Sequence, residues 1–150
     1  MNVQVIKTYW PNGNPNEEYF TENGVKNGMY RSWHENGNKS YEYMYIYGAI
    51  YGLYQSWHEN GTRCQESMYL YNKEHGICRS WYTNGQILDE CTYVNGVLDG
   101  LYQSWYSNGQ KCNECTYMNG ITHGTVRVWC KSGDLERELM FMNGVKITVM

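Results

Sequence analysis

The chain has 150 residues, with 12 basic and 15 acidic side chains and a formal net charge of −3. This balance, without a basic stripe, argues against nucleic acid and disfavours an anionic membrane as an electrostatic partner. The first residues carry no charged segment followed by an apolar run, and no stretch approaches the roughly 18 apolar residues of a membrane span, so neither a signal peptide nor a span is expected.

The residue content points to strands and to a reducing setting. Sixteen Tyr and six Trp stand against two Phe and two Pro, and such aromatics favour strands of a sheet with half-wet faces. Without a secretory signal, the six cysteines predict reduced thiols and an intracellular protein. These cysteines are Cys64, Cys78, Cys91, Cys112, Cys115 and Cys130.

A period of 24 residues runs through the chain. It is marked by Trp33, Trp57, Trp81, Trp105 and Trp129, each inside a copy of the phrase Gly-x-Tyr-x-Ser-Trp-x-x-Asn-Gly. One short unit cannot bury its own apolar face and must lean on its neighbours. Residues 1–150 are therefore predicted to form one continuous repeat array rather than separate domains.

Each copy is expected to be a β-hairpin. Its first turn is an Asn-Gly pair such as Asn108-Gly109, and a second turn follows the next strand. Asn-Gly between strands predicts a two-residue loop in which both residues take positive φ. The expected fold is all-β, a single-layer antiparallel meander of about twelve strands in about six repeats. The second turns are Asn23-Gly24, Tyr47-Gly48, Tyr71-Asn72, Asn95-Gly96, Asn119-Gly120 and Asn143-Gly144.

The two-residue loop fixes a register that the copies test. It sets Trp105 opposite Cys112 and, throughout the chain, a basic or amide side chain opposite a glutamate. Cross-strand pairs of this kind contribute about 0.2–1 kcal/mol each. The pairs are Lys7/Glu18, Arg31/Glu42, Gln55/Glu66, Arg79/Glu90, Gln103/Glu114 and Arg127/Glu138.

The alternative is a three-residue loop with a bulge. It would set Arg127 against Arg137 and Gln103 against Asn113, which loses the charge pairs. The two-residue loop is therefore preferred. The preferred register also places a glycine opposite an aromatic ring, a device of sheets that bend. Those pairs are Gly28/Tyr45, Gly52/Tyr69, Gly76/Tyr93, Gly100/Tyr117 and Gly124/Phe141.

The repeated phrase, with Tyr-x-Asn-Gly-x-x-x-Gly after it, resembles the MORN repeat in its variant form. The likeness is clearest over Gly96 to Gly109 and Tyr117 to Gly124, and it covers essentially the whole chain. The uniform wording is similar to expanded giant-virus families and to bacterial YwqK-type antitoxin-like repeats. The copies depart from the pattern at Asn72, Cys78, Val128 and Ser132. The resemblance implies a β-meander used for protein association, in some members for phospholipid contact, and it supplies no catalytic residue.

Several polar columns could suggest chemistry but are better explained by the repeat. The glutamates from Glu18 to Glu138 lie two strands apart from copy to copy, about 9.5 Å, too far to share a cation. The lone Cys112-x-x-Cys115 places its thiols on opposite faces of a strand and has no second pair. His34 with His58, and His75 with His123, share columns without a nucleophile. No catalytic, cofactor or metal site is expected.

The aromatic columns are the candidate interaction surface. A single layer cannot hide both faces, so part of their area should stay exposed and mark an interface. Cys78 and Cys91 are expected to face each other. The candidate residues are Trp33, Trp57, Trp81, Trp105, Trp129, Tyr30, Tyr54, Tyr102, Tyr45, Tyr69, Tyr93, Tyr117 and Phe141.

The end strands are a second candidate for association. Val145, Ile147 and Val149 alternate along a last strand whose outer edge could pair with another copy or another protein. The expected function is a non-enzymatic scaffold or structural protein that binds protein, and the more specific expectation is a component of a giant-virus virion or virus factory. The alternatives are a peripheral phospholipid-binding adaptor and an antitoxin-like inhibitor.

Overall fold

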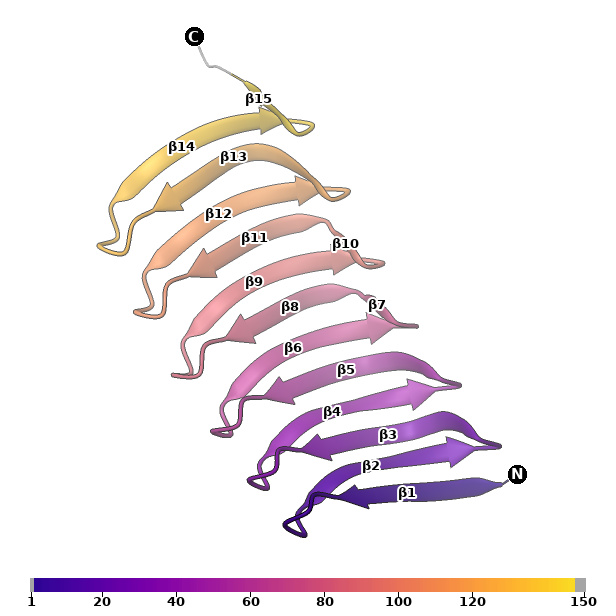
Figure 1. Cartoon of the computed structure of the whole chain (residues 1–150). Helices are drawn as coiled ribbons and strands as arrows, with labels where there is room; N and C mark the ends of the chain where they lie inside the picture. The colour runs from indigo at the N-terminus through magenta and orange to yellow at the C-terminus, as the bar shows by residue number, and fades with distance from the viewer. Residues whose placement is uncertain (1, 148–150) are drawn as a thin grey trace. The chain divides into compact units, whose positions relative to one another are not determined.

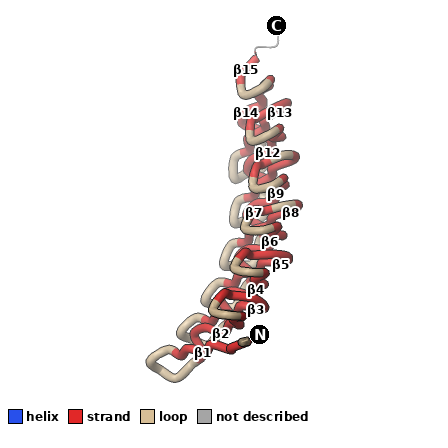
Figure 2. The backbone as a smooth tube through the Cα atoms, turned by 90° about the vertical axis from the view of Figure 1, so that its right-hand side faces the viewer, coloured by secondary structure: helices blue, strands red, loops and turns tan. Residues whose placement is uncertain are grey.

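The computed structural model describes residues 2–147, which form strands and turns throughout. That range contains no helix, and hence none long and apolar enough to cross a membrane (Figure 2). The chain divides into two compact units, Met1–Lys73 and Glu74–Met150, and three of the six copies fall in each. The predicted all-β antiparallel meander is confirmed in both units, while the continuity of one array over residues 1–150 stays a prediction.

The first unit is a meander in which each strand pairs antiparallel with the next along the chain (Figure 1). Its hairpins are β1–β2, β3–β4 and β5–β6. The strands are β1 (Val3–Tyr9), β2 (Pro15–Glu22), β3 (Val25–Trp33), β4 (Lys39–Ile46), β5 (Ala49–Trp57) and β6 (Arg63–Leu70).

The second unit repeats this order, with β7 (Lys73–Glu74) at the boundary between the units. The short β10 and the longer β11 both pair with β9, since one predicted strand is interrupted at Asp99. Its strands are β8 (Gly76–Trp81), β9 (Ile87–Val94), β10 (Val97–Leu98), β11 (Gly100–Trp105), β12 (Lys111–Met118), β13 (Ile121–Trp129), β14 (Leu135–Met142) and β15 (Val145–Ile147).

The second turn of each copy has the predicted geometry. Asn119 and Gly120 take φ of 50° and 78°, and the residues that flank them, Met118 and Ile121, pair directly. Positive φ at both central residues is the mark of the two-residue hairpin loop whose twist matches the strands. Two copies place Tyr47 and Tyr71 at the first of these positions, with φ of 47° and 49°.

The first turn differs from the prediction. At Asn108-Gly109 only the glycine has positive φ, and the Gly109 amide donates to the Tyr106 carbonyl while the Tyr106 amide donates to the Gln110 carbonyl. This is the three-residue loop with a glycine bulge. The two-residue loop was therefore wrong here, because Asn-Gly suits both turn types and only the glycine requires positive φ in this one.

The strand register is nevertheless right, because a second bulge compensates for the longer loop. Trp105 pairs with Lys111 instead of Cys112, but Ser104 pairs with Asn113, and Cys112 is the extra residue between them. Beyond this bulge Gln103 faces Glu114 as predicted. The same shift lies beside the Trp column in the other five copies, so the charge pairs and the glycine–aromatic pairs are all confirmed.

The glycine column also bends the strands. Gly100 faces Tyr117 within its hairpin with φ of 124°, and a methyl group on it would come 3.1 Å from Thr92 Cβ of the neighbouring strand. Next to these glycines the register shifts between hairpins, as between Glu114 and Thr116 opposite β13. Strands bulged at one column in successive copies curve together, as the arched arrows in Figure 1 show.

Side chains alternate between two faces, which we name here. The ladder face carries the charge pairs, Lys7 to Glu66 in unit 1 and Arg79 to Glu138 in unit 2. The tyrosine face carries the neighbours of those residues, with Tyr30 and Tyr43 in unit 1 and Cys78 and Cys91 in unit 2. Tyr30, Cys78, Cys91 and Cys115 are the buried hydrophobic residues, so the small core lies on the tyrosine face.

Candidate interaction surfaces

A row of stacked tyrosines crosses the tyrosine face of unit 1. The Tyr30 ring lies 6.1 Å from Tyr19 and 4.7 Å from Tyr43, and Tyr43 lies 5.3 Å from Tyr54. All three pairs are stacked, a geometry that adds about 0.5–1.5 kcal/mol per pair beyond burial. Tyr45 closes over the row edge-on, 6.2 Å from Tyr30. These rings pack against one another because they occupy matching positions on neighbouring strands, which lie about 4.8 Å apart in a sheet.

Two polar groups complete this row. The Lys26 ammonium lies 4.5 Å, 5.0 Å and 5.2 Å from the centroids of Tyr19, Tyr30 and Tyr45, a cation held by ring faces. The Tyr30 hydroxyl donates to the Glu17 carboxylate at 2.9 Å. Burial, followed by that hydrogen bond, raises the pKa of Tyr30 to about 12.

In unit 2, cysteines stand at some of the positions that tyrosines hold in this row of unit 1. Cys78 faces Cys91 across β8 and β9, as predicted, and both are buried. The hydrogen bond that Cys91 makes to Cys78, followed by burial, raises the pKa of Cys91 well above its usual range. Tyr102 pairs with Cys115 in the next hairpin. Such thiols pack as small apolar groups and are poor nucleophiles.

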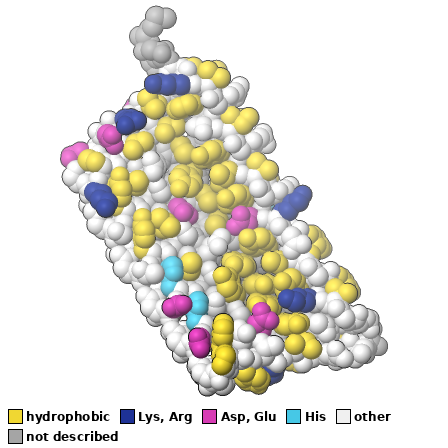
Figure 3. Space-filling view, in the orientation of Figure 1, with side chains coloured by type: hydrophobic (Ala, Val, Ile, Leu, Met, Phe, Trp, Pro, Cys, Tyr) yellow, Lys and Arg dark blue, Asp and Glu magenta, His cyan; other side chains and the backbone are white. Residues whose placement is uncertain are grey.

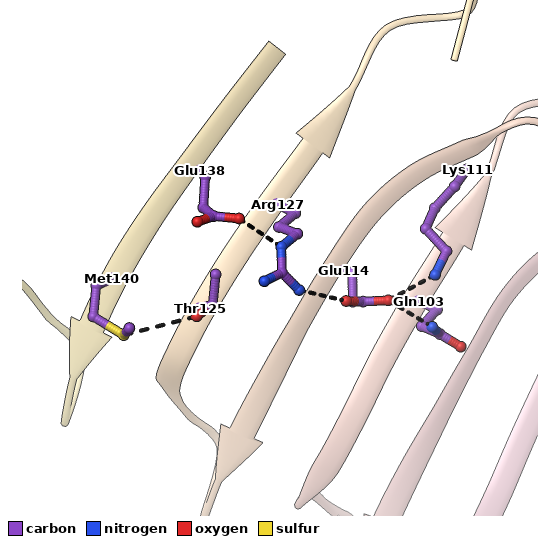
Figure 4. Close-up of polar contacts among 7 residues, drawn as sticks. All are labelled: Gln103, Lys111, Glu114, Thr125, Arg127, Glu138 and Met140. Carbon is purple, nitrogen blue, oxygen red and sulfur yellow. Dashed lines mark hydrogen bonds and ion pairs between the residues drawn. The ribbon is translucent and has the colours of Figure 1, made fainter. Parts of the chain in front are cut away.

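The ladder face is crossed by linked ion pairs. Figure 4 shows Glu114 accepting from Gln103 at 2.8 Å, Lys111 at 2.6 Å and Arg127 at 3.2 Å, while Arg127 also bonds Glu138 at 2.6 Å. The bonds from Lys111 and Gln103 lower the pKa of Glu114. The carboxylates of Glu114 and Glu138 already bind side chains of the same protein. We therefore interpret these ion pairs as structural.

The structure separates the predicted aromatic residues onto two faces. The Lys39 ammonium binds Glu42 on the ladder face at 3.0 Å and lies 4.9 Å from the Trp57 ring, so the Trp column lies beside the ladder. Tyr30 stands three residues before Trp33 on the same strand, and because side chains alternate between faces, an odd separation puts the two on opposite faces. The Tyr45 column lies on the same face as Tyr30. All five tryptophans of the Trp column are half-buried. The Trp and Tyr columns therefore lie on different faces of the strands, although Trp33 and Tyr30 both line a pocket at the first-turn loops of unit 1.

Both units keep apolar side chains at the surface, and Figure 3 shows them gathered along the strands on one face. On the ladder face they form a strip beside the charge pairs, with Val3 62% and Met44 40% exposed at the two extremes in unit 1. We call these residues the apolar strip. They are Val3, Val5, Val25, Met44, Leu53 and Met68 in unit 1, and Ile77, Val94, Val97, Leu101, Met118, Ile121, Met142 and Val145 in unit 2.

The strip of unit 1 contains a groove of about 310 Å³. Met44, Tyr51 and Leu53 form its walls, and Gly52, which has open space where a side chain would stand, lies in it. The prediction from the aromatic columns missed this strip. Its signal was available, since Met44, Leu53 and Met68 each stand two positions from a ladder residue and so share its face.

Within each unit, the first-turn loops are joined by hydrogen bonds that run from one copy to the next. Trp10 Nε1 donates to the Trp33 carbonyl at 2.9 Å, and the Tyr82 and Tyr106 hydroxyls donate to the carbonyls of Trp105 and Trp129. His34 Nε2 lies 2.8 Å from the Trp57 carbonyl in the same arrangement. Trp10, His34, Tyr82 and Tyr106 share one column, and in each of these copies an aromatic side chain bonds the backbone carbonyl of the next copy. The role of this column is therefore structural.

The second histidine column has a different structural role. His75 Nδ1 accepts from the Asn95 amide at 3.4 Å, and His123 Nδ1 accepts from the Asn143 amide at 3.5 Å, so each bonds the neighbouring second turn. Asn27 and Asp99 hold the same column and make the same bond. Across residues 2–147, no three His, Cys, Asp or Glu side chains gather as metal ligands would.

The last strand is described only in part. Val145 and Ile147 belong to β15 and pair with Met142 and Met140 of β14, whereas Val149 lies outside the described residues. Association through the end strands stays a prediction.

The comparisons with known proteins agree with the repeat. A family model described as MORN repeat variant matches residues 74–95 and 98–119, two adjacent copies in unit 2. No curated protein matches the chain. MORN repeats are in general protein- or membrane-interaction modules and a non-catalytic repeat type. The chain is similar to this repeat over the matched residues.

Proposed function

We propose that this chain is a non-enzymatic scaffold that binds partner proteins through the apolar strip of its ladder face. The observation that carries the proposal is the segregation of exposed apolar side chains. Beside the ladder they form a strip in each unit, whereas within the strands of residues 2–147 Tyr41 is the exposed large hydrophobic residue on the tyrosine face. Contiguous exposed apolar area on a soluble face is typical of a protein interface.

The charge pairs support the same use. Lys7, Arg31 and Glu42 are already bonded to neighbours along the ladder, so a partner need not neutralise them. A polar ladder beside an apolar strip has the composition of an interface with a polar rim. The more specific role that we propose is that of a virion or virus-factory component in a reducing, intracellular setting. The phospholipid-binding adaptor and the antitoxin-like inhibitor are the alternatives.

The strip can be tested with a matched pair of variants. Met44→Ser/Leu53→Ser removes apolar area from the groove, and the turn variant Tyr47→Ser removes a 79% exposed ring from a turn outside it. We expect a defined partner, recovered by affinity capture and then purified, to bind the wild type and the turn variant but to bind the strip variant at least tenfold more weakly. Equal binding by both variants would contradict the use of the strip.

A vesicle experiment separates the alternative. Phosphatidylserine vesicles at physiological salt should not carry the wild-type chain on flotation, because its net charge is −3 and no lysine cluster is present. Clear co-flotation that is lost in Met44→Ser/Leu53→Ser would assign the strip to lipid instead of protein.

A further inference from the structure

A second surface lies on the tyrosine face of unit 1, where the strands meet the first-turn loops. A cavity of about 370 Å³ opens there, with Glu17 of β2, Tyr30 and Ser32 of β3, and Tyr41 of β4 in its lining. An adjoining hollow of about 390 Å³ shares Glu35 and Glu59 with it. We call the two together the loop-side cavity.

The loop-side cavity carries negative charge without positive partners. Glu17, Glu35 and Glu59 belong to its lining, which contains no lysine or arginine. None of the three makes an ion pair within residues 2–147, in contrast to the occupied glutamates of the ladder. Glu17 accepts one hydrogen bond from the Tyr30 hydroxyl at 2.9 Å, which leaves further acceptor capacity on its carboxylate.

Aromatic rings form the remaining walls. Trp10, Trp33 and Tyr41 line the cavity, and Tyr41 is 42% exposed. The Trp10 ring is fixed because its Nε1 donates to the Trp33 carbonyl. Rigid rings beside carboxylates are the surroundings that a lysine ammonium or an arginine guanidinium prefers.

A buried serine in the lining is also unsatisfied. Ser32 is 6% exposed, and its hydroxyl has no hydrogen-bond partner in the described part of the chain. Buried polar atoms are nearly always paired, so an orphan beside an open cavity points to a ligand or water that completes it. A ligand that donates hydrogen bonds would meet this need, since Glu17 also only accepts when ionised.

Two of the three equivalent positions of unit 2 have lost this charge. The residues 72 positions later than Glu17, Glu35 and Glu59 are Asp89, Ser107 and Lys131. The repeat alone therefore does not require glutamate in these loops. The carboxylates at positions 35 and 59 are a property of unit 1.

We propose that the loop-side cavity binds a lysine or arginine side chain of an extended basic segment in a partner protein. The adjoining hollow gives space for the segment beyond that side chain. The proposal goes beyond the use of the apolar strip, because the cavity is on the other face and has the opposite chemistry.

The test is a titration of the full chain against a short fluorescent peptide of alternating lysine and serine, followed by anisotropy. Peptides with arginine or glutamate in place of lysine, and free spermidine as a competitor, complete the set. We expect the lysine and arginine peptides to bind and the glutamate peptide to fail. Glu35→Gln/Glu59→Gln should weaken binding about tenfold, as the loss of charge-assisted hydrogen bonds implies.

A matched variant controls for overall charge. Asp89→Asn/Glu136→Gln removes two negative charges from unit 2 and should change affinity less than about twofold, because neither side chain lines the loop-side cavity. Equal weakening by both variants would overturn the proposal, as would spermidine binding as tightly as the peptide, which would indicate a site for small free cations. Melting curves for each variant establish that it is folded. Met44→Ser/Leu53→Ser should retain peptide binding, which keeps this result separate from the test of the strip.

Discussion

The side-chain amide of Asn108 donates a hydrogen bond to the backbone carbonyl of Lys131, 23 residues later, at 3.0 Å. The Oδ1 atom of the same side chain accepts from the Gln110 amide at 3.1 Å, which closes its own loop. Asn36 and Asn84 make the same bond to the next loop, to the carbonyls of Glu59 and Ser107. In these copies the asparagine of the first turn thus joins neighbouring loops, and its own φ is not positive.

This role predicts opposite outcomes for one substitution at two turns. Asn108→Gly removes both side-chain hydrogen bonds and should lower the free energy of unfolding by about 1–2 kcal/mol. Asn119→Gly, at the second turn, should change it by less than about 0.5 kcal/mol, because glycine adopts the φ of 50° there easily. Urea melts of the two variants measure the difference. Equal losses would show that both asparagines act through backbone conformation.

A tyrosine in a second turn predicts a stabilising change. Tyr47 holds a φ of 47° and is 79% exposed, so its ring contributes little burial to offset the cost of this conformation. Four other copies have asparagine there. Tyr47→Asn should raise the free energy of unfolding by about 0.5–1 kcal/mol, measured by denaturant melts. A loss of stability would mean that the exposed ring makes a favourable contact.

The tyrosine row predicts alkaline sensitivity. Burial and the bond to Glu17 raise the pKa of Tyr30 to about 12, and burial, followed by its bond to Tyr45, raises the pKa of Tyr43 further. A raised pKa means that the folded state holds the proton more tightly. The stabilisation is present below the usual tyrosine pKa near 10 and is lost as pH rises toward about 12.

Unfolding free energies between pH 8 and pH 12 test this sign. The wild type should lose stability steadily above about pH 10, and Tyr30→Phe should lose less, because it removes one of the titrating groups. Tyr71→Phe, at an exposed turn, serves as the control and should follow the wild type. A Tyr30→Phe curve parallel to the wild type would show that Tyr30 titrates normally.

The cysteines should differ in reactivity in an order that the structure sets. The bond to Ser132 lowers the pKa of Cys130, whereas the bond to Cys78 and burial raise the pKa of Cys91. At neutral pH, iodoacetamide should modify Cys130 first and Cys91 more than about tenfold more slowly, because the thiolate is the reactive form. Peptide mapping by mass spectrometry gives the order. Early modification of Cys91 would contradict its burial opposite Cys78.

The sequence predicted the strands and their register for a physical reason. Six copies repeat the same cross-strand pairs, and pairs such as Arg127/Glu138 are sensitive to a slip of one residue. The loop could not be distinguished by these pairs. The extra residue of the first turn is cancelled by the bulge at Cys112, and both lie outside the stretch in which the pairs stand.

The candidate surface was predicted less well. Trp105 and Tyr102 were placed in one aromatic set, although three residues separate them and strand alternation puts them on different faces. The apolar strip could be predicted from Leu53 and Met68, which match across their hairpin as apolar residues, but the predicted surface included only the aromatic columns. The loop-side cavity depends on Glu17, Glu35 and Glu59, which come together only through the bulged loops that the sequence did not indicate.

The bonds between first-turn loops all point one way along the chain, so the two sides of a copy are not equivalent. In each described case the donor belongs to the earlier copy, as with Trp10 and Tyr82, and the acceptor is a backbone carbonyl of the later one. Removing the later neighbour would strand part-buried ring donors, which are costly to leave unmade. At these loops, removing the earlier neighbour would uncover carbonyls, which water satisfies. The second turns are bonded in the opposite sense, since the Gly48 and Gly120 amides donate to the Lys26 and Leu98 carbonyls, which lie beside the preceding second turn. Fraying should therefore begin at opposite ends of a unit on the two sides that carry the turns.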